Sequence, residues 1–380
     1  MGMSSTSLSS ARGTGIGAQI ARRALVVVLL TAVAASLLLA VPGLDGVARD
    51  IEGLNAGWLV AAVGLEVGSC LAFVVIFRLF FDEVSAGPAR ELAWTEQGAG
   101  ALLPGGGAGA LAIGGWLLQR QGVSRRRVIE RSSALFFLTS AINVAALVGA
   151  GALLAAGVAS GPHGLVLAGI PVIGGLTAVV AVLLIARLMR RSSPRREASW
   201  VTDLVDGIHG ARRAMLSPHW RLIGAIGYLA LDIGALGALF AATGQPMPIA
   251  PLVLGYLIGY LANLIPVPGG IGVLEGGLAG TLIAYGAPVT QATAAVMVYH
   301  AIAFWIPSLG GVSGYALLQR RQRRAVSATA PSPPGSALAD VPGDHLPELE
   351  GRGSGRHDRV LRGELTQRLL VVCLDDRQAV

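Results

Sequence analysis

The stretch at residues 263–275 constrains the fold of this chain most strongly, because it interrupts an apolar region with residues that break helices. It reads N-L-I-P-V-P-G-G-I-G-V-L-E, with two prolines, three glycines and one carboxylate. Proline removes a backbone donor and glycine weakens helices, so an unbroken α-helix does not run through it. Non-helical backbone at membrane depth persists only where protein or a water-filled cavity satisfies its polar groups. The stretch therefore predicts either the tip of a re-entrant hairpin that lines a substrate path or a loop at the membrane surface.

The composition indicates a membrane protein with several spans. Of the 380 residues, 53% are hydrophobic and 13% are charged, whereas soluble domains carry roughly 25% charged residues. The formal charge of +7 comes from arginines that cluster beside apolar runs. This is the positive-inside pattern rather than a basic stripe on a soluble surface, so we expect no nucleic-acid partner.

Six full spans are predicted from apolar runs and arginine placement. The first follows Arg22-Arg23 and covers residues 24–41, which is too long for the apolar core of a signal peptide, so we expect it to be retained with a cytoplasmic N-terminus. The other five spans lie near residues 57–81, 132–156, 165–188, 222–242 and 289–318. The last of these is expected to be interrupted at Pro307 and Gly310-Gly311.

Two apolar segments predict re-entrant hairpins, and the first of them is too short for two crossings. The first covers residues 92–118, has arginine-rich flanks and centres on Pro104, Gly105 and Gly106, so it is expected to enter from the cytoplasm. The second covers residues 250–286, holds the motif described first and has uncharged outer flanks, so it is expected to enter from outside.

The predicted domain organisation is a transmembrane domain at 22–324 between two disordered cytoplasmic segments. Those segments are residues 1–21 and 325–380, which are rich in small and polar residues. Between the fourth and fifth spans, apolar residues recur at helical spacing near 200–208. They predict a short amphipathic helix on the inner leaflet, with a solvated basic linker as the alternative.

The predicted spans divide into halves at about 22–157 and 164–324, with the same order of elements and opposite orientation. Glu66 and Asp232 lie near the middle of equivalent spans. Each is expected to face the bundle interior or a wet cavity, or to be a structural acid that is protonated or hydrogen-bonded. The predicted fold class is an all-α polytopic membrane protein with about six spans and two hairpins in an inverted repeat. Paired interrupted segments in inverted halves are typical of transporters with a site near the midplane.

The late motif also carries a resemblance to a known family. Residues 261–275, Gly286, Tyr299-His300 and the W-I-P-S-L-G block at 305–310 resemble the membrane region of lysylphosphatidylglycerol synthases and the stand-alone flippase-like proteins related to it. The resemblance covers about residues 20–324. It implies a stand-alone form without the aminoacyl-transferase domain, because the 56 residues after it are too few and too polar for that domain.

This chain departs from the family pattern where relatives carry charge. The early motif usually places Arg and Glu after its first Pro-Gly, whereas this chain has Gly106 or Gly107 and Ala110 there. The arginine usual in the late helix is His300 here. If those charges contact a lipid headgroup in relatives, the resemblance implies a different substrate or mechanism for this chain.

The candidate site combines hairpin tips with the few polar residues near them. Anionic headgroups would meet free backbone N–H groups at the broken helix ends, with Arg120 near the inner mouth. Glu275 either titrates or pairs with a cationic headgroup or with His300, or it stabilises the first turn of its own helix. His300 is either a proton switch or a packing residue. The candidate substrate-path residues are Pro104, Gly105, Gly106, Arg120, Asn263, Pro266, Pro268, Gly269, Gly270, Gly272, Glu275 and His300, and the candidate buried acids are Glu66 and Asp232.

The predicted function is that of a lipid flippase or lipid-linked substrate transporter in the plasma membrane, with a membrane lipid, an anionic phospholipid among the candidates, as partner. No motif for soluble catalysis, metal binding or a cofactor is found, so we expect neither an enzyme nor a metal. One alternative is a non-catalytic scaffold that binds partners through residues 188–221 or the tail. The other is an enzyme acting on lipid phosphates with Glu66 and Asp232 as acid and base. Against this enzyme alternative, the sequence near the two acids lacks the basic or metal-binding residues that would accompany them.

Overall fold

The computed structural model describes residues 45–103, 106–162, 164–192, 200–216, 219–265 and 272–329. One compact unit ends at Ala325, and only residues 326–329 of the unit that follows it are described. Within the described ranges the chain forms helices and no strands. The predicted first span at 24–41 lies outside these ranges, as do residues 1–21 and most of the predicted tail.

Among the described residues, five helices are long and apolar enough to cross a membrane, which confirms the prediction of an all-α polytopic membrane protein. They correspond to the second through sixth predicted spans. A short helix, α2 (Asp45–Glu52), precedes them, and short irregular helices lead into two of them: η1 (Leu165–Gly169) before α7 and η2 (Trp220–Leu222) before α9. The five are α3 (Ala56–Phe80), α6 (Arg125–Ala155), α7 (Ile170–Ser192), α9 (Ile223–Ala242) and α12 (Val289–Thr329).

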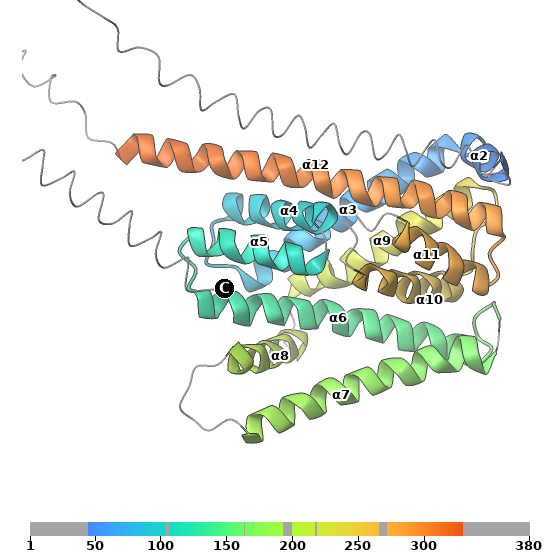
Figure 1. Cartoon of the computed structure of the whole chain (residues 1–380), viewed down its shortest axis with the longest axis horizontal. Helices are drawn as coiled ribbons and strands as arrows, with labels where there is room; N and C mark the ends of the chain where they lie inside the picture. Colours follow the sequence, from blue (N-terminus) through green and yellow to red (C-terminus); the bar gives the residue numbers. More distant parts are fainter. Residues whose placement is uncertain are drawn as a thin grey trace, which may run out of the picture. The chain divides into compact units, whose positions relative to one another are not determined.

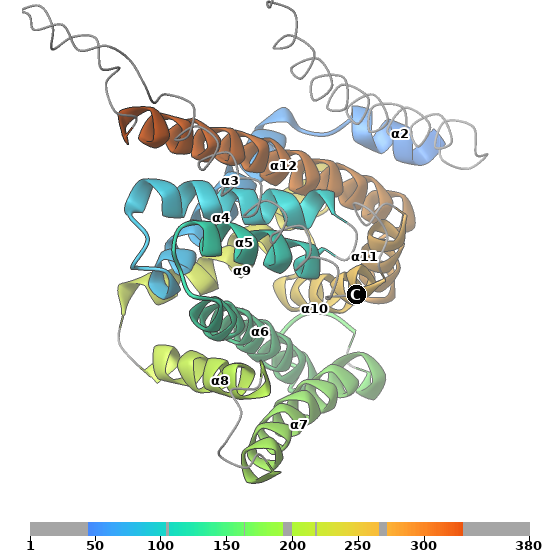
Figure 2. The same cartoon turned by 60° about the vertical axis from the view of Figure 1, so that its left-hand side comes forward.

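Two pairs of shorter helices form the hairpins. The first pair is α4 (Ala86–Leu102) and α5 (Gly107–Arg120). The second is α10 (Ile249–Gly259), extended by η3 (Tyr260–Leu264), and α11 (Val273–Ala284). Helices of 14 and 12 residues, as α5 and α11 are, extend about 20 Å, less than the roughly 30 Å of a bilayer core. The open ends of the two hairpins lie at opposite ends of the unit, and their tips point toward each other (Figure 1, Figure 2).

Each hairpin packs into an apolar core of its own. Buried side chains of α4 and α5 join those of α3 and α6, among them Phe77, Leu92, Leu118 and Leu135. Buried side chains of α10 and α11 join those of α9 and α12, among them Leu236, Leu252, Leu278 and Val296. The two hairpins therefore have separate apolar cores, and α3, α9 and α12 contribute side chains to both.

The predicted interruption of the last span is wrong, because α12 continues through Pro307 and Gly310-Gly311 to Thr329. A proline inside a membrane helix is tolerated where neighbouring groups compensate for the lost hydrogen bond. The glycines serve close packing instead: a Cβ atom on Gly98 of α4 would lie 2.7 Å from Cα of Gly311 and 2.8 Å from the carbonyl oxygen of Pro307. Small residues that allow two backbones to approach are typical of helix contacts in membranes.

The predicted amphipathic helix is confirmed and longer than expected, since α8 spans Trp200–Leu216. It packs against α6 (Figure 2). A Cβ atom on Gly207 would lie 2.5 Å from Cβ of Ser133. The segment is therefore a packed helix rather than a solvated linker, while its position at a lipid surface stays a prediction.

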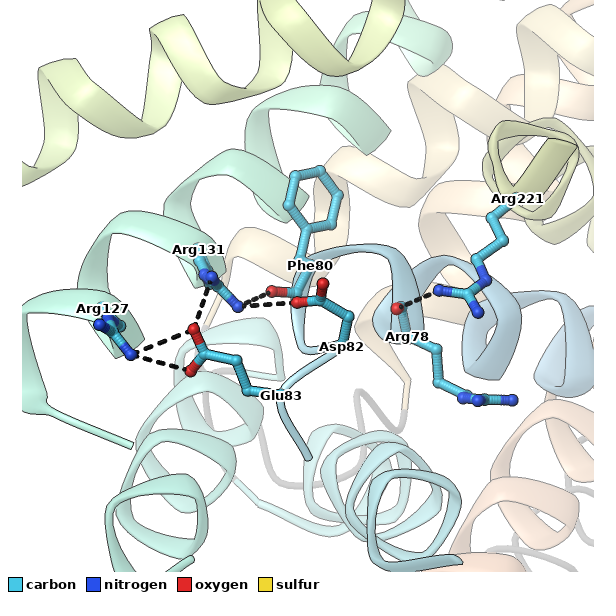
Figure 3. Close-up of polar contacts among 7 residues, drawn as sticks. All are labelled: Arg78, Phe80, Asp82, Glu83, Arg127, Arg131 and Arg221. Atoms are coloured by element: carbon cyan, nitrogen blue, oxygen red, sulfur yellow. Dashed lines mark hydrogen bonds and ion pairs between the residues drawn. The ribbon is translucent and has the colours of Figure 1, made fainter. Parts of the chain in front are cut away.

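Arginine side chains satisfy the last carbonyl groups of α3 (Figure 3). Arg131 of α6 donates to the carbonyl oxygen of Phe80 at 2.7 Å, and Arg221 of η2 donates to that of Arg78 at 2.9 Å. The final carbonyls of a helix have no partner within it, so cationic side chains placed there stabilise the end.

The same arginine-rich end carries a small ion-pair network. Arg127 and Arg131 both bind Glu83, at 3.1 Å and 2.9 Å, and Arg131 also reaches Asp82 at 3.2 Å (Figure 3). The arginines that indicate a cytoplasmic face in the sequence thus also join α3, the loop after it and α6.

We expect Gly98→Leu to lower the stability of the protein, because its side chain would displace α12 at the Gly311 contact. Overpacking of this kind costs about 1–3 kcal/mol. The measurement is the thermal unfolding midpoint of the purified protein in detergent. The matched control is Gly64→Ala, since a Cβ atom at Gly64 of α3 meets no other atom within 4 Å. Equal midpoints for Gly98→Leu and the parent protein would contradict the close α4–α12 contact.

Candidate functional site

The tips of the two hairpins meet at Gly106 and Asn263. Gly106 lies just before α5 with φ +46°, a conformation that favours glycine, and a Cβ atom there would lie 3.2 Å from Nδ2 of Asn263. Asn263 belongs to η3, which extends α10 to the tip of the second hairpin. The structure therefore brings together two of the candidate substrate-path residues that are far apart in sequence. The other tip candidates, Pro104, Gly105, Pro266, Pro268, Gly269 and Gly270, lie outside the described residues.

Glu275 fixes the start of α11 to α12. Its Oε2 atom accepts a hydrogen bond from the backbone N–H of Gly272 at 2.6 Å, which satisfies one of the unpaired donors at the helix N-terminus. Its Oε1 atom lies 2.6 Å from Nδ1 of His300, which is only 8% exposed. The two roles considered for Glu275, capping its own helix and pairing with His300, are both present. His300 likewise has a defined partner rather than only a packing role.

Asp232 of α9 is held by two tyrosines from different elements. Tyr256 of α10 donates its hydroxyl to Oδ2 at 2.5 Å, and Tyr299 of α12 donates to Oδ1 at 2.6 Å. Both tyrosines are almost fully buried. Each oxygen of the Asp232 carboxyl group therefore accepts a hydrogen bond, and the contact joins α9 to the second hairpin and to α12.

Glu66 of α3 faces Asp232 across the α3–α9 contact. Its side chain is 5% exposed, and its Oε1 atom lies 4.0 Å from Sγ of Cys70. Its Oε2 atom is buried and has no partner at hydrogen-bonding geometry. The two acids that occupy equivalent spans in the sequence thus form one pair in the bundle interior.

A continuous series of contacts connects this acid pair to the hairpin tips. Tyr299, which binds Asp232, is followed in α12 by His300, which binds Glu275 at the start of α11. On the other side, the ring of Tyr256 stacks on that of Tyr260, with centroids 5.2 Å apart, and Tyr260 begins η3, which carries Asn263. These contacts therefore join the acid pair to both arms of the second hairpin.

The structure does not bring Arg120 to the tips. It lies in the last turn of α5, thirteen residues after Gly107, so the helix separates it from the tip by about 20 Å. Its guanidinium carbon lies 4.4 Å from the ring centroid of Trp116. Arg120 thus remains near the arginine-rich end.

Sequence reasoning missed the tyrosines and two further acids. Tyr256 and Tyr299 carry hydroxyls inside otherwise apolar helices, which is the signal that would have pointed to them, because a buried hydroxyl needs a partner. Glu91 and Glu96 are also buried in α4. Glu91 accepts from Nε of Arg321 at 2.7 Å, so it joins α4 to α12. Within the described ranges, no group of three or more His, Cys, Asp or Glu side chains is placed to hold a metal ion.

We expect a photoreactive benzoylphenylalanine at position 263 to crosslink to the first hairpin, because Asn263 contacts Gly106. Mass spectrometry of the digested adduct should map the crosslink to residues at the start of α5. The control position is Leu261, which is 60% exposed and turned away from the protein, and which should label lipid or detergent instead. Crosslinks from position 263 to lipid alone would show that the tips do not meet.

Comparison with known proteins places the chain in a family. Residues 24–311 match the family described as the lysylphosphatidylglycerol synthase TM region. A UPF0104 membrane protein of Methanothermobacter thermautotrophicus is 34% identical over 89 residues, which are 23% of this chain and 25% of that relative. The match thus spans about a quarter of the length of the curated relative. Because the family match takes in both hairpins and their junction, this integral membrane protein belongs to the lysylphosphatidylglycerol synthase TM region family.

Proposed function

We propose that this protein moves a lipid or a lipid-linked substrate across the bilayer. The observation that carries the proposal is the contact between Gly106 and Asn263 at the tips of two hairpins whose open ends lie at opposite ends of the bundle. Broken helices that meet near the middle of a membrane are typical of transporter sites. Opposed hairpins give a polar headgroup a protected place halfway across, reached from either side.

The geometry of the tips favours an anionic headgroup. Both α5 and α11 begin at a tip, so the partial positive charge of each helix N-terminus is directed to the meeting point. In α11 the carboxylate of Glu275 lies in the first turn, whereas the first turn of α5 contains no acid. The N–H groups of α5 are therefore the ones we propose to bind a phosphate, and an anionic phospholipid is the substrate class that fits.

The plasma membrane is the proposed location, with both termini in the cytoplasm. The orientation is supported by the arginines at the ends of α3, α5 and α12 and at the start of α6, which belong to one end of the bundle. We also propose that the chain acts without catalysing a chemical reaction. The support is that the family match concerns the transmembrane region of the synthases.

The test is reconstitution of the full-length protein into vesicles that contain fluorescent phospholipids of anionic and zwitterionic headgroups. Bleaching of the outer leaflet by a membrane-impermeant reductant then reports movement between leaflets. We expect faster movement than in empty vesicles, and faster for the anionic probe. Absence of movement with every probe would overturn the transporter proposal and favour the scaffold alternative.

Within this assay, Glu275→Gln should slow transport about tenfold or more, since a hydrogen bond to a charged group contributes roughly 1.5–3 kcal/mol. Glutamine can still accept from the backbone of Gly272, so the cap is retained while the charge facing His300 is lost. The control is Glu52→Gln, a substitution of an exposed acid at the end of α2. An unchanged rate in Glu275→Gln would assign Glu275 to capping alone.

A further inference from the structure

The hydrogen bonds around the acid pair distinguish the protonation states of its two members. Both oxygens of Asp232 accept from tyrosine hydroxyls, at 2.5 Å and 2.6 Å, which is the arrangement expected of an ionised carboxylate. Glu66, by contrast, buries its Oε2 atom without a hydrogen-bond donor, and its carboxyl group faces that of Asp232. An ionised carboxylate with an unpaired buried oxygen is costly, and a second negative charge beside Asp232 adds repulsion. Neighbouring carboxyl groups in such surroundings share one proton.

We propose that Glu66 and Asp232 form a proton-binding site, and that loading and unloading of this proton drives the movement of the second hairpin during transport. In the packed arrangement described above, the proton resides on Glu66 and Asp232 carries the charge. Coupling to transport rests on the proposed function, whereas the proton site itself stands on the geometry alone.

Among the described residues, the side chains around the pair supply no positive charge that would replace the proton. None of the titratable side chains that interact with it in these ranges is basic, and Gln97 of α4 is directed to the carbonyl oxygen of Cys70. His300, the neighbour of Tyr299, is directed to Glu275. The titratable side chains around the pair are Cys70 on α3, Tyr228 on α9, Tyr256 and Tyr260 on the second hairpin and Tyr299 on α12.

Loss of the proton would act on a tight helix contact. A Cβ atom on Gly224 of α9 would lie 2.7 Å from the carbonyl oxygen of Ala72 in α3, so the two backbones nearly touch. Two adjacent negative charges in an apolar interior repel strongly, which favours separation of α3 from α9. Asp232 is bound to Tyr256 of α10 and Tyr299 of α12, so its displacement would move α10 and the part of α12 whose His300 contacts Glu275.

The first experiment detects the proton without any transport. Infrared difference spectra of the purified full-length protein, recorded between neutral and alkaline pH, should show the carbonyl stretch of a protonated carboxylic acid that disappears as pH rises. Glu66→Gln should lack this component. Glu96→Gln is the matched control, because Glu96 is a buried acid of a different helix, α4, and its removal should leave the Glu66 component in place. Persistence of the component in Glu66→Gln, or its loss in Glu96→Gln alone, would overturn the proposal.

The second experiment tests coupling in the vesicle assay with an anionic fluorescent phospholipid. The parent protein should move the lipid several-fold faster with a pH gradient than at equal pH, and a protonophore should remove the difference. Glu66→Gln should show equal rates in both conditions, whereas Glu52→Gln should retain the response. Acceleration by a sodium gradient in place of a pH gradient would overturn the assignment of the site to a proton.

The two experiments separate the possible failures. If the parent protein moves no lipid in either condition, the proposed function fails while the infrared measurement still decides whether the site holds a proton. If lipid moves at the same rate with and without a pH gradient, the proposed function stands and the coupling is refuted.

Discussion

The broken backbone of the two hairpins can exist within an apolar layer only where other parts of the protein receive its polar groups. Hydrocarbon offers no hydrogen bonds, so an unpaired N–H or C=O costs several kcal/mol there. The two tips are directed at each other, so that Gly106 contacts Asn263. At the start of α11, Glu275 accepts from the backbone N–H of Gly272. The longer helices pack around these short elements.

Close backbone contacts and arginine side chains hold the helices together around the two hairpins. The glycines of α4 and α12 let the two helices nearly touch at Gly98 and Gly311. At the arginine-rich end, Arg131 and Arg221 satisfy the last carbonyls of α3. The first contact is available only because no side chain intervenes, and the second only because guanidinium groups combine length with several donors. The first contact holds α4 against α12, and the second holds the end of α3 against α6 and η2.

The polar residues in the bundle interior differ from these structural contacts. The pair formed by Glu66 and Asp232 carries an unbalanced charge among apolar side chains, and it is joined to the second hairpin through hydroxyls rather than through packing alone. Acids inside membrane segments are costly, so they are commonly functional. A bundle built only for stability would fill these positions with apolar residues. The arrangement instead makes helix positions sensitive to a single proton, which is the physical content of the coupling proposed here.

The sequence alone determined the fold class, five of the spans within the described residues, both hairpins and the amphipathic helix α8. These follow from apolar run lengths, arginine placement and helix-breaking residues, which act locally. It misjudged Pro307 and Gly310-Gly311, because the effect of these residues depends on whether another helix approaches them. Only the tertiary structure decided that Glu66 meets Asp232, that tyrosines complete the network and that Gly106 meets Asn263. Helices bring together residues separated by more than 150 positions, and no local pattern specifies which faces will meet.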